Sequence, residues 1–317
     1  MSRNGEWFIF MEKKTNGKGI VFLVITAVVW GFAFVAQSVG SEYVNSFVFN
    51  GIRFTLGGLS LIPVIFVFEK GANDAKMMET TVVAGLVCGV VLFSASTLQQ
   101  YGIELYNKAG FPDSSGRAGF LTALYMVIVP LIGLFLKRRP SAETWFGIAF
   151  AVAGLFLISF TNGFSVSFED LVIIGCAVLF AVHIIVIDRF GDQMYSLRFA
   201  MTQFLVCAVL SGLFALVGTA SGMMEANTMA DIKAALPAIL YGGFMSVGIA
   251  YTFQILGQKN AEPAFASIIL STESMFSVIG GAIILGETMT VRGYIGCALI
   301  FAGIILTQVK IFGRKKD

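Results

Sequence analysis

Three ionisable side chains lie deep inside apolar stretches of the sequence: Glu273, Arg53 and His183. Glu273 sits within "SIILSTESMFSVIGGAIILGE", residues 267–287, with apolar residues on both sides. If this stretch crosses a bilayer, a carboxylate near its centre costs about 2.5–3.5 kcal/mol on insertion scales. Such a group is expected to have a partner or a functional role.

Each of the three has a functional and a structural interpretation. Glu273 either lines a cavity, where it binds a cationic or hydrogen-bond-donating solute group or carries an exchanged proton, or belongs to a structural ion pair or hydrogen bond. Arg53 is predicted to be a structural anchor or a solute contact. His183 is either a neutral imidazole bonded to a backbone carbonyl or a proton relay.

A second group of polar and aromatic residues falls at comparable depths. Amides and aromatic rings around a cavity would suit an amphipathic or aromatic solute, through hydrogen bonds, stacking or cation–π contacts. The alternative for each is ordinary packing between helices. Besides Glu273, Arg53 and His183, the candidate cavity residues are Trp30, Gln99, Tyr101, Thr122, Tyr125, Tyr251, Gln254 and Ser271.

The composition indicates which elements position these residues. The chain has 317 residues, of which 57% are hydrophobic and only 13% charged, with a mean hydropathy of +0.85. Soluble domains are far more charged than this. We therefore expect an all-α integral membrane protein, in contact with the lipid bilayer, and no nucleic-acid partner.

Apolar runs long enough to cross a bilayer predict ten transmembrane helices. Arg53 lies within a span; of the basic residues at or beyond the span ends, only Lys108, Arg117, Lys233 and Arg292 fall on one side, while the others fall on the side of the termini. The positive-inside rule places both termini in the cytoplasm of a cell (plasma or inner) membrane. The expected spans are 19–38, 45–68, 80–101, 117–136, 142–160, 170–187, 195–218, 236–257, 263–285 and 291–311.

The two halves of the sequence repeat. "VVWGFAFVAQ" at 28–37 aligns with "VLFAVHIIVI" at 178–187, and "LQQYG" at 98–102 with "FQILG" at 253–257. The boundaries predict an N-terminal segment 1–18, five-helix repeats at 19–160 and 170–311, and a basic tail 312–317. Because five is an odd number, the second repeat must be inverted, an arrangement typical of transporters that alternate access around a site between the repeats.

Motifs for other chemistry are lacking. The sequence has no phosphate-binding loop, no zinc-protease or serine-hydrolase motif and no CxxC spacing, so we expect no cofactor, no metal and no enzyme activity. The four cysteines, Cys88, Cys176, Cys207 and Cys297, lie in apolar runs and are interpreted as core residues. A channel, a membrane receptor or, less favoured, an intramembrane lipid-modifying enzyme are the alternatives to a transporter.

The two repeats resemble the EamA-type transporters of the drug/metabolite transporter superfamily. The similarity is carried by "VVWGFAF", "LQQYGIELYNKAGF", "FLTALYMVIVPLIGLFLKRRPSAETWFGIAFAVAGL" and "ILSTESMFSVIGGAIILGETMTVRGYIGCALIFAGIIL". It implies a secondary transporter of small organic metabolites, with a cavity between the first four helices of each repeat and helices 5 and 10 at the periphery. The family commonly has Pro after the glutamate of helix 9, where this chain has Ser274.

Small residues predict where helices approach closely. Gly85-x-x-x-Gly89 in helix 3, Gly147-x-x-x-Ala151 in helix 5 and Ala298-x-x-x-Ala302 in helix 10 are spacings of this kind. They predict tight packing, and in helices 5 and 10 they are also compatible with a homodimer.

Overall fold

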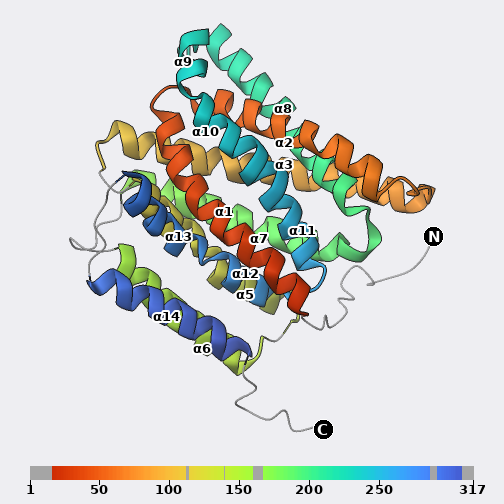
Figure 1. Ribbon diagram of the computed structural model, residues 1–317, viewed down its shortest axis with the longest axis vertical. Coiled ribbons are helices and arrows are strands. Elements are labelled where there is room, and N and C mark those ends of the chain that lie inside the picture. The colour runs from red at the N-terminus through yellow and green to blue at the C-terminus, as the bar shows by residue number, and fades with distance from the viewer. Residues whose placement is uncertain (1–15, 112–113, 139, 160–166, 286–290, 309–317) are drawn as a thin grey trace.

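The computed structural model describes residues 16–111, 114–138, 140–159, 167–285 and 291–308 (Figure 1). Within these ranges the chain forms helices joined by turns, without strands. The predicted segment 1–18, apart from its last three residues, and the predicted tail 312–317 lie outside the described residues. The elements are α1 (Gly17–Ser41), α2 (Ser46–Phe68), α3 (Ala75–Lys108), α4 (Ser114–Ala123), α5 (Tyr125–Phe135), α6 (Ala142–Ser159), α7 (Phe168–Phe190), η2 (Gly191–Gln193), α8 (Ser196–Ala220), α9 (Met229–Ala234), α10 (Leu236–Leu240), η3 (Tyr241–Tyr251), α11 (Thr252–Gln258), α12 (Pro263–Leu270), α13 (Glu273–Gly280), η4 (Gly281–Leu285) and α14 (Val291–Gln308).

These elements combine into the expected membrane spans. In the described ranges, eight helical segments are long and apolar enough to cross a membrane, and two shorter apolar helices, Ala142–Leu157 and Val291–Leu306, correspond to predicted spans 5 and 10. Three spans are composite: α4 with α5, α10 with η3 and α11, and α12 with α13 and η4. The prediction of an all-α, ten-helix fold is confirmed.

Polar residues at the turns determine where several helices begin. The Asn16, Asn45 and Asp74 side chains accept hydrogen bonds from the free N–H groups that open α1, α2 and α3. Ser167 forms a capping box with Asp170 at the start of α7. The short polar turns between apolar runs therefore fix the helix boundaries.

Equivalent helices of the two repeats pack against each other in opposite directions. In the pair α2 and α8, Gly51 lies near Ser211, and Gly58, two turns further along α2, lies near Leu205. In the pair α4 and α13, Gly119 lies against Ser277. As the residue numbers increase along one helix, the residue numbers of its contacts on the other helix decrease. Equivalent helices therefore run antiparallel, as an inverted repeat requires.

The helices exchange between repeats to form two bundles. In what we call the α1 bundle, α1 and α2 of the first repeat pack with the α10–η3–α11 and α12–α13 spans of the second. In the α7 bundle, α7 and α8 of the second repeat pack with α3 and the α4–α5 span of the first. Each bundle therefore contains helices of both repeats, and the two bundles pack against each other through α2 with α8 and α4 with α13.

Helices α6 and α14 pair at the edge of the molecule (Figure 1). A methyl group placed on Gly303 would lie 2.6 Å from the carbonyl oxygen of Gly147, and one on Gly154 would collide with the carbonyl oxygen of Gly296. The small residues thus serve contact within one chain, although in α14 they are Gly296 and Gly303, whereas Ala298 is exposed. The homodimer through these helices stays a prediction.

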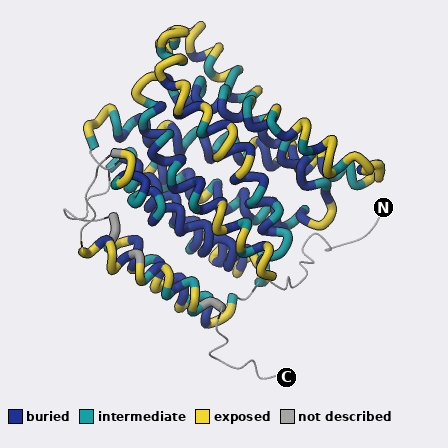
Figure 2. Tube along the Cα trace, in the orientation of Figure 1, coloured by how far each residue is buried: buried dark blue, intermediate teal, exposed yellow. Residues whose placement is uncertain are grey.

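Many of the exposed residues on the outer faces of the helices (Figure 2 shows which residues are exposed) are large and apolar. Phe66, Val67 and Phe68 at the end of α2 are 70%, 71% and 77% exposed, and Leu216 and Val217 of α8 are 70% and 61% exposed. Such side chains match the hydrocarbon of a bilayer. Polar groups, in contrast, gather between the two bundles.

Candidate functional site

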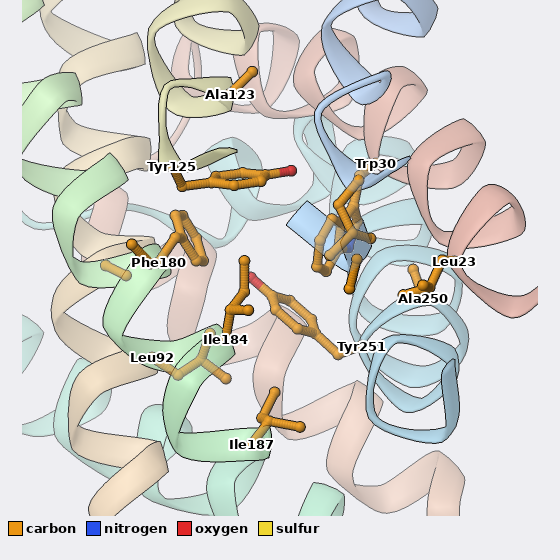
Figure 3. Packing of buried hydrophobic residues seen from close by; sticks show 14 of the residues in the cluster. Leu23, Trp30, Leu92, Ala123, Tyr125, Phe180, Ile184, Ile187, Ala250 and Tyr251 are labelled. Carbon is orange, nitrogen blue, oxygen red and sulfur yellow. The ribbon is translucent and has the colours of Figure 1, made fainter. Parts of the chain in front are cut away.

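A small pocket lies between the two bundles, near the middle of the spans. The aromatic rings of Trp30, Tyr125, Phe180 and Tyr251 surround it (Figure 3). The free space accommodates about one or two water molecules. Its walls are formed by Trp30, Ala33, Phe34 and Gln37 of α1, Arg53 of α2, Gln99 of α3, Thr122 and Tyr125 of the α4–α5 span, Phe180 of α7, Ser246 and Tyr251 of η3, and Glu273 of α13.

Two locally irregular helices meet at this pocket. The fourth span has a one-residue turn at Leu124 and the ninth a two-residue turn at Ser271 and Thr272, so that Tyr125 and Glu273 each begin the following half-helix. The two turns, which we call breaks, lie at equivalent positions of the two repeats. Each span continues through its break, because Leu124, Ser271 and Thr272 keep right-handed helical backbone angles.

Hydroxyl groups accompany the break in the ninth span without a proline. Ser271 and Thr272 donate to the carbonyls of Ile268 and Ile269, 2.7 Å away in both cases. Ser274, which occupies the position where the family commonly has Pro, donates to the carbonyl of Ser271 at 2.8 Å. These bonds from side chain to backbone compete with the regular helix ladder and loosen it locally.

The half-helices are joined across the bundles by one hydrogen bond. The Tyr125 hydroxyl donates to Oε1 of Glu273 at 3.0 Å, and both side chains are buried. Within the described residues, Glu273 has no basic group within ion-pair distance. Glu273 therefore forms no ion pair with Arg53 or His183 but does form a hydrogen bond, the other structural partner considered from the sequence, while it also lines the pocket.

Arg53 forms the opposite part of the pocket wall. Its Nε donates to Oδ1 of Asn50 at 2.9 Å and its Nη1 to Oε1 of Gln37 at 3.1 Å. The guanidinium carbon lies 5.3 Å from the ring centre of Phe49 and 5.2 Å from that of Phe54. Neutral acceptors and aromatic faces thus orient the guanidinium without neutralising its charge.

An 11-residue π-helix, η3, brings Ser246 and Tyr251 to the pocket together. In an α-helix, residues five apart differ by about 140° in direction, so both could not face the same space. The wider turn of the π-helix brings them nearer to one face. The Ser246 carbonyl accepts a hydrogen bond from Nε1 of Trp30 at 3.3 Å, which ties η3 to α1.

Hydrogen bonds between the bundles close the pocket on both sides. We call the side where α1 begins and α14 ends the terminal side, and the other the far side. On the far side, Gln100 Nε2 donates to the Gln37 carbonyl at 3.1 Å, and the Ser38 and Ser114 hydroxyls lie 2.8 Å apart. On the terminal side, Gln258 Nε2 donates to the Ile184 carbonyl at 3.0 Å.

The structure brings most of the predicted residues together. Of the sequence candidates, the pocket wall contains Trp30, Arg53, Gln99, Thr122, Tyr125, Tyr251 and Glu273. The sequence reasoning missed Ala33, Phe34, Gln37, Phe180 and Ser246. Phe180 had a usable signal, since the repeat aligns it with Trp30.

Four candidates lie away from the pocket wall, and their part in solute binding stays a prediction. Tyr101 is 41% exposed on the outside of α3. Gln254 is buried but does not line the pocket, and the Ser271 hydroxyl is bonded to its own helix. His183 is bonded through Nε2 to Oε1 of Gln203 at 3.1 Å, rather than to a backbone carbonyl, and its ring lies behind the pocket rings of Phe180 and Tyr251.

Comparisons with known proteins agree with this architecture. The model of the EamA-like transporter family matches the chain twice, at residues 17–160 and 167–309. A solved crystal structure with 19% sequence identity superimposes with a TM-score of 0.71, covering 92% of this chain and 96% of that one. At this level of identity the superposition shows the fold alone.

Relatives of similar length carry transporter names. An uncharacterized transporter of Archaeoglobus fulgidus is 25% identical and is covered to 91%, with 95% of this chain aligned. A probable terminal-alkyne amino-acid exporter of Streptantibioticus cattleyicolor is 24% identical, with 95% of this chain and 96% of that protein aligned. Together with the doubled family match, these similarities show that the chain is a multi-pass membrane protein that belongs to the EamA-like transporter family.

Proposed function

We propose that the protein is a secondary transporter that moves a small organic metabolite by alternating access. The solute binds in the pocket between the α1 bundle and the α7 bundle. Transport needs neither ATP nor a cofactor, and the protein catalyses no chemical reaction.

The observation that carries this proposal is a pocket between the repeats that is closed on both sides. Solute pockets usually measure about 300–1,000 Å³, far more than the space left here. A solute can therefore enter only when the bundles separate. Because hydrogen bonds join the bundles on the far side as well as on the terminal side, separation on one side at a time gives alternating access.

Charge supports an orientation for this cycle. Lys18, Lys70, Lys76, Lys137 and Lys259 lie on the terminal side. By the positive-inside rule, the terminal side faces the cytoplasm of a cell membrane. The bonds of Gln100 and Ser38 would then form an outer gate, and the bond of Gln258 an inner gate.

The pocket walls and one relative support an organic solute. Trp30, Phe180 and Tyr251 offer apolar surface and aromatic faces, and Gln99 offers an amide. The relative from Streptantibioticus cattleyicolor is named as an exporter of an amino acid with a terminal alkyne, a solute with a polar and an apolar end. A solute of that general build fits these walls.

A disulfide across the far side tests the cycle. Ser38 belongs to the α1 bundle and Ser114 to the α7 bundle, and their hydroxyls are close enough for cysteines at both positions to bond. The variant S38C/S114C should lose counterflow of radiolabelled solute in proteoliposomes when oxidised and regain it with a reductant, while each single variant stays active.

Three outcomes would contradict the proposal. Unchanged counterflow in the oxidised double variant would mean that the far side does not open. Flux that does not saturate, with no exchange across the membrane, would indicate a channel. Conversion of the solute into a product would indicate an enzyme.

A further inference from the structure

Arg53 is a buried cation without an anionic partner in the described part of the chain. Its side chain is 2% exposed, and no carboxylate lies within ion-pair distance. Nε and Nη1 bond to neutral acceptors, whereas Nη2 is buried and has no hydrogen-bond partner. A buried charge with an unused donor is unfavourable unless another group completes it.

Two partly buried arginines are paired with carboxylates. Arg117 forms an ion pair of 2.6 Å with Asp170, and Arg138 pairs with Asp188. Both of these arginines are more exposed than Arg53, at 13% and 20% of the side chain. The most deeply buried of the three is therefore the one without a counter-charge, and it is also the one that lines the pocket.

A purely structural role explains only part of the arrangement. The guanidinium packs against the rings of Phe49 and Phe54. Its Nε is satisfied by Asn50 and its Nη1 by Gln37. These contacts leave Nη2 unexplained. Glu273, the acid of the same pocket, is bonded to Tyr125 and not to Arg53.

A second unused donor lies on the same wall. Tyr251 lines the pocket, and its hydroxyl makes no hydrogen bond with the described residues. Its ring packs 6.1 Å from that of Phe54, the residue next to Arg53 in the chain. A guanidinium N–H and a phenol O–H are the donors that suit the two oxygens of a carboxylate.

We propose that Arg53 binds the carboxylate of the transported solute, with the Tyr251 hydroxyl as a second donor, so that the substrates are small anionic or zwitterionic carboxylates. This inference rests on the proposed function, because it assigns a role within the same transport pocket. The apolar part of the solute lies among Trp30, Phe180 and Tyr125. A solute ammonium or other donor lies toward Glu273.

Matched pairs of acids and amides test the inference. Each pair consists of an amino acid or a monocarboxylic acid and its primary amide, which differ only in the carboxylate. Binding is measured by thermal stabilisation of the purified full chain, since a ligand of the folded state raises the unfolding temperature. We expect at least one acid to stabilise the protein while its amide does not.

Variants connect that preference to the two donors. Arg53→Gln should weaken binding of the preferred acid by about thirtyfold or more, because a charge-assisted pair is lost in a buried site. Tyr251→Phe, which keeps the ring, should weaken it by about two- to tenfold. Arg292→Gln removes an exposed arginine outside the pocket and should change nothing.

The results separate this inference from the proposed function. The role of Arg53 is overturned if no acid in the panel is preferred over its amide. It is also overturned if Arg53→Gln and Tyr251→Phe both bind the preferred acid as tightly as the parent protein does. If Arg53→Gln fails to fold, the test rests on Tyr251→Phe: its preference for the acid over the amide must be weaker than that of the parent protein. Preferred acids that bind but show no counterflow would instead overturn transport and leave the carboxylate site standing.

Discussion

The two repeats share a backbone design but place different side chains at equivalent positions of the pocket. When "RF" at 53–54 is aligned with "QF" at 203–204, the counterpart of Arg53 is Gln203. Arg53 lines the pocket, whereas Gln203 bonds to His183 away from it. Tyr125 and Glu273 both begin a half-helix, yet one is a phenol donor and the other a carboxylate acceptor. The helix arrangement shared by the two repeats forms the scaffold. The side chains that differ between the repeats give the pocket an uneven distribution of charge.

The glycine contacts of α6 and α14 represent the symmetric scaffold. Gly154→Val and Gly303→Val should each destabilise the protein by about 1–3 kcal/mol, because each added side chain meets a carbonyl oxygen of the other helix. The two losses should be nearly equal in thermal unfolding. Gly212→Val, where nothing lies within 4 Å of the added group, is the control. Unequal losses would show that this helix pair is not symmetric in energy.

Removing the charge of Glu273 and removing the hydroxyl of Tyr125 should affect stability and transport differently. Glu273→Gln keeps the shape and removes the charge, so we expect stability near that of the parent and a fall in transport of about ten- to a hundredfold. Tyr125→Phe leaves the buried carboxylate without its donor and should also cost about 1–3 kcal/mol of stability. Thermal unfolding and uptake are measured on both. A Glu273→Gln protein with unchanged affinity and pH profile of uptake would remove the functional role of the carboxylate.

Much of this arrangement could be predicted because it depends on hydrophobicity and depth. Apolar runs gave the spans, and the odd number of helices in each repeat gave the inversion. The direction of a side chain around its helix was harder to predict. Gln99 faces the pocket, but Tyr101 is turned by about 200° from it and faces outward, although both have the same depth.

Local irregularities explain the other differences. The π-helix η3 changes the direction of every residue after it in the eighth span, so the alignment of Gln254 with Gln99 does not carry Gln254 to the pocket. The break at Ser271 and Thr272 depends on hydroxyl groups rather than on a proline, and such a break has no strong sequence signal. The partner of His183 is a side chain of another helix, which only the packing decides.

The glutamine bonds of the two sides occupy related helices, α3 with α1 and α11 with α7. Gln100→Leu should favour opening of the far side and Gln258→Leu opening of the terminal side, each by about two- to tenfold, since one neutral hydrogen bond is lost in each. Labelling of Ser246→Cys, a pocket position, by an impermeant thiol reagent from each side of oriented vesicles measures the shift. If each variant changed the labelling rate equally from both sides of the membrane, the two sides would not act as separate gates.

The smallest effect is expected for the glutamine pair that the alignment made equivalent. Gln99 bonds to Thr122 at 3.3 Å on the pocket wall, so Gln99→Leu should lower uptake several-fold by removing a polar contact for the solute. Gln254 is 1% exposed, its Oε1 has no hydrogen-bond partner, and it does not reach the pocket. A leucine there fills nearly the same volume and relieves a buried polar atom, so Gln254→Leu should leave uptake within about twofold and stability equal or slightly higher. Initial rates of uptake at matched expression compare the two variants. If Gln254→Leu lowered uptake as much as Gln99→Leu, the equivalence of the repeats would extend to the chemistry of the pocket, and the asymmetry inferred from Arg53 and Glu273 would not describe how the solute is held.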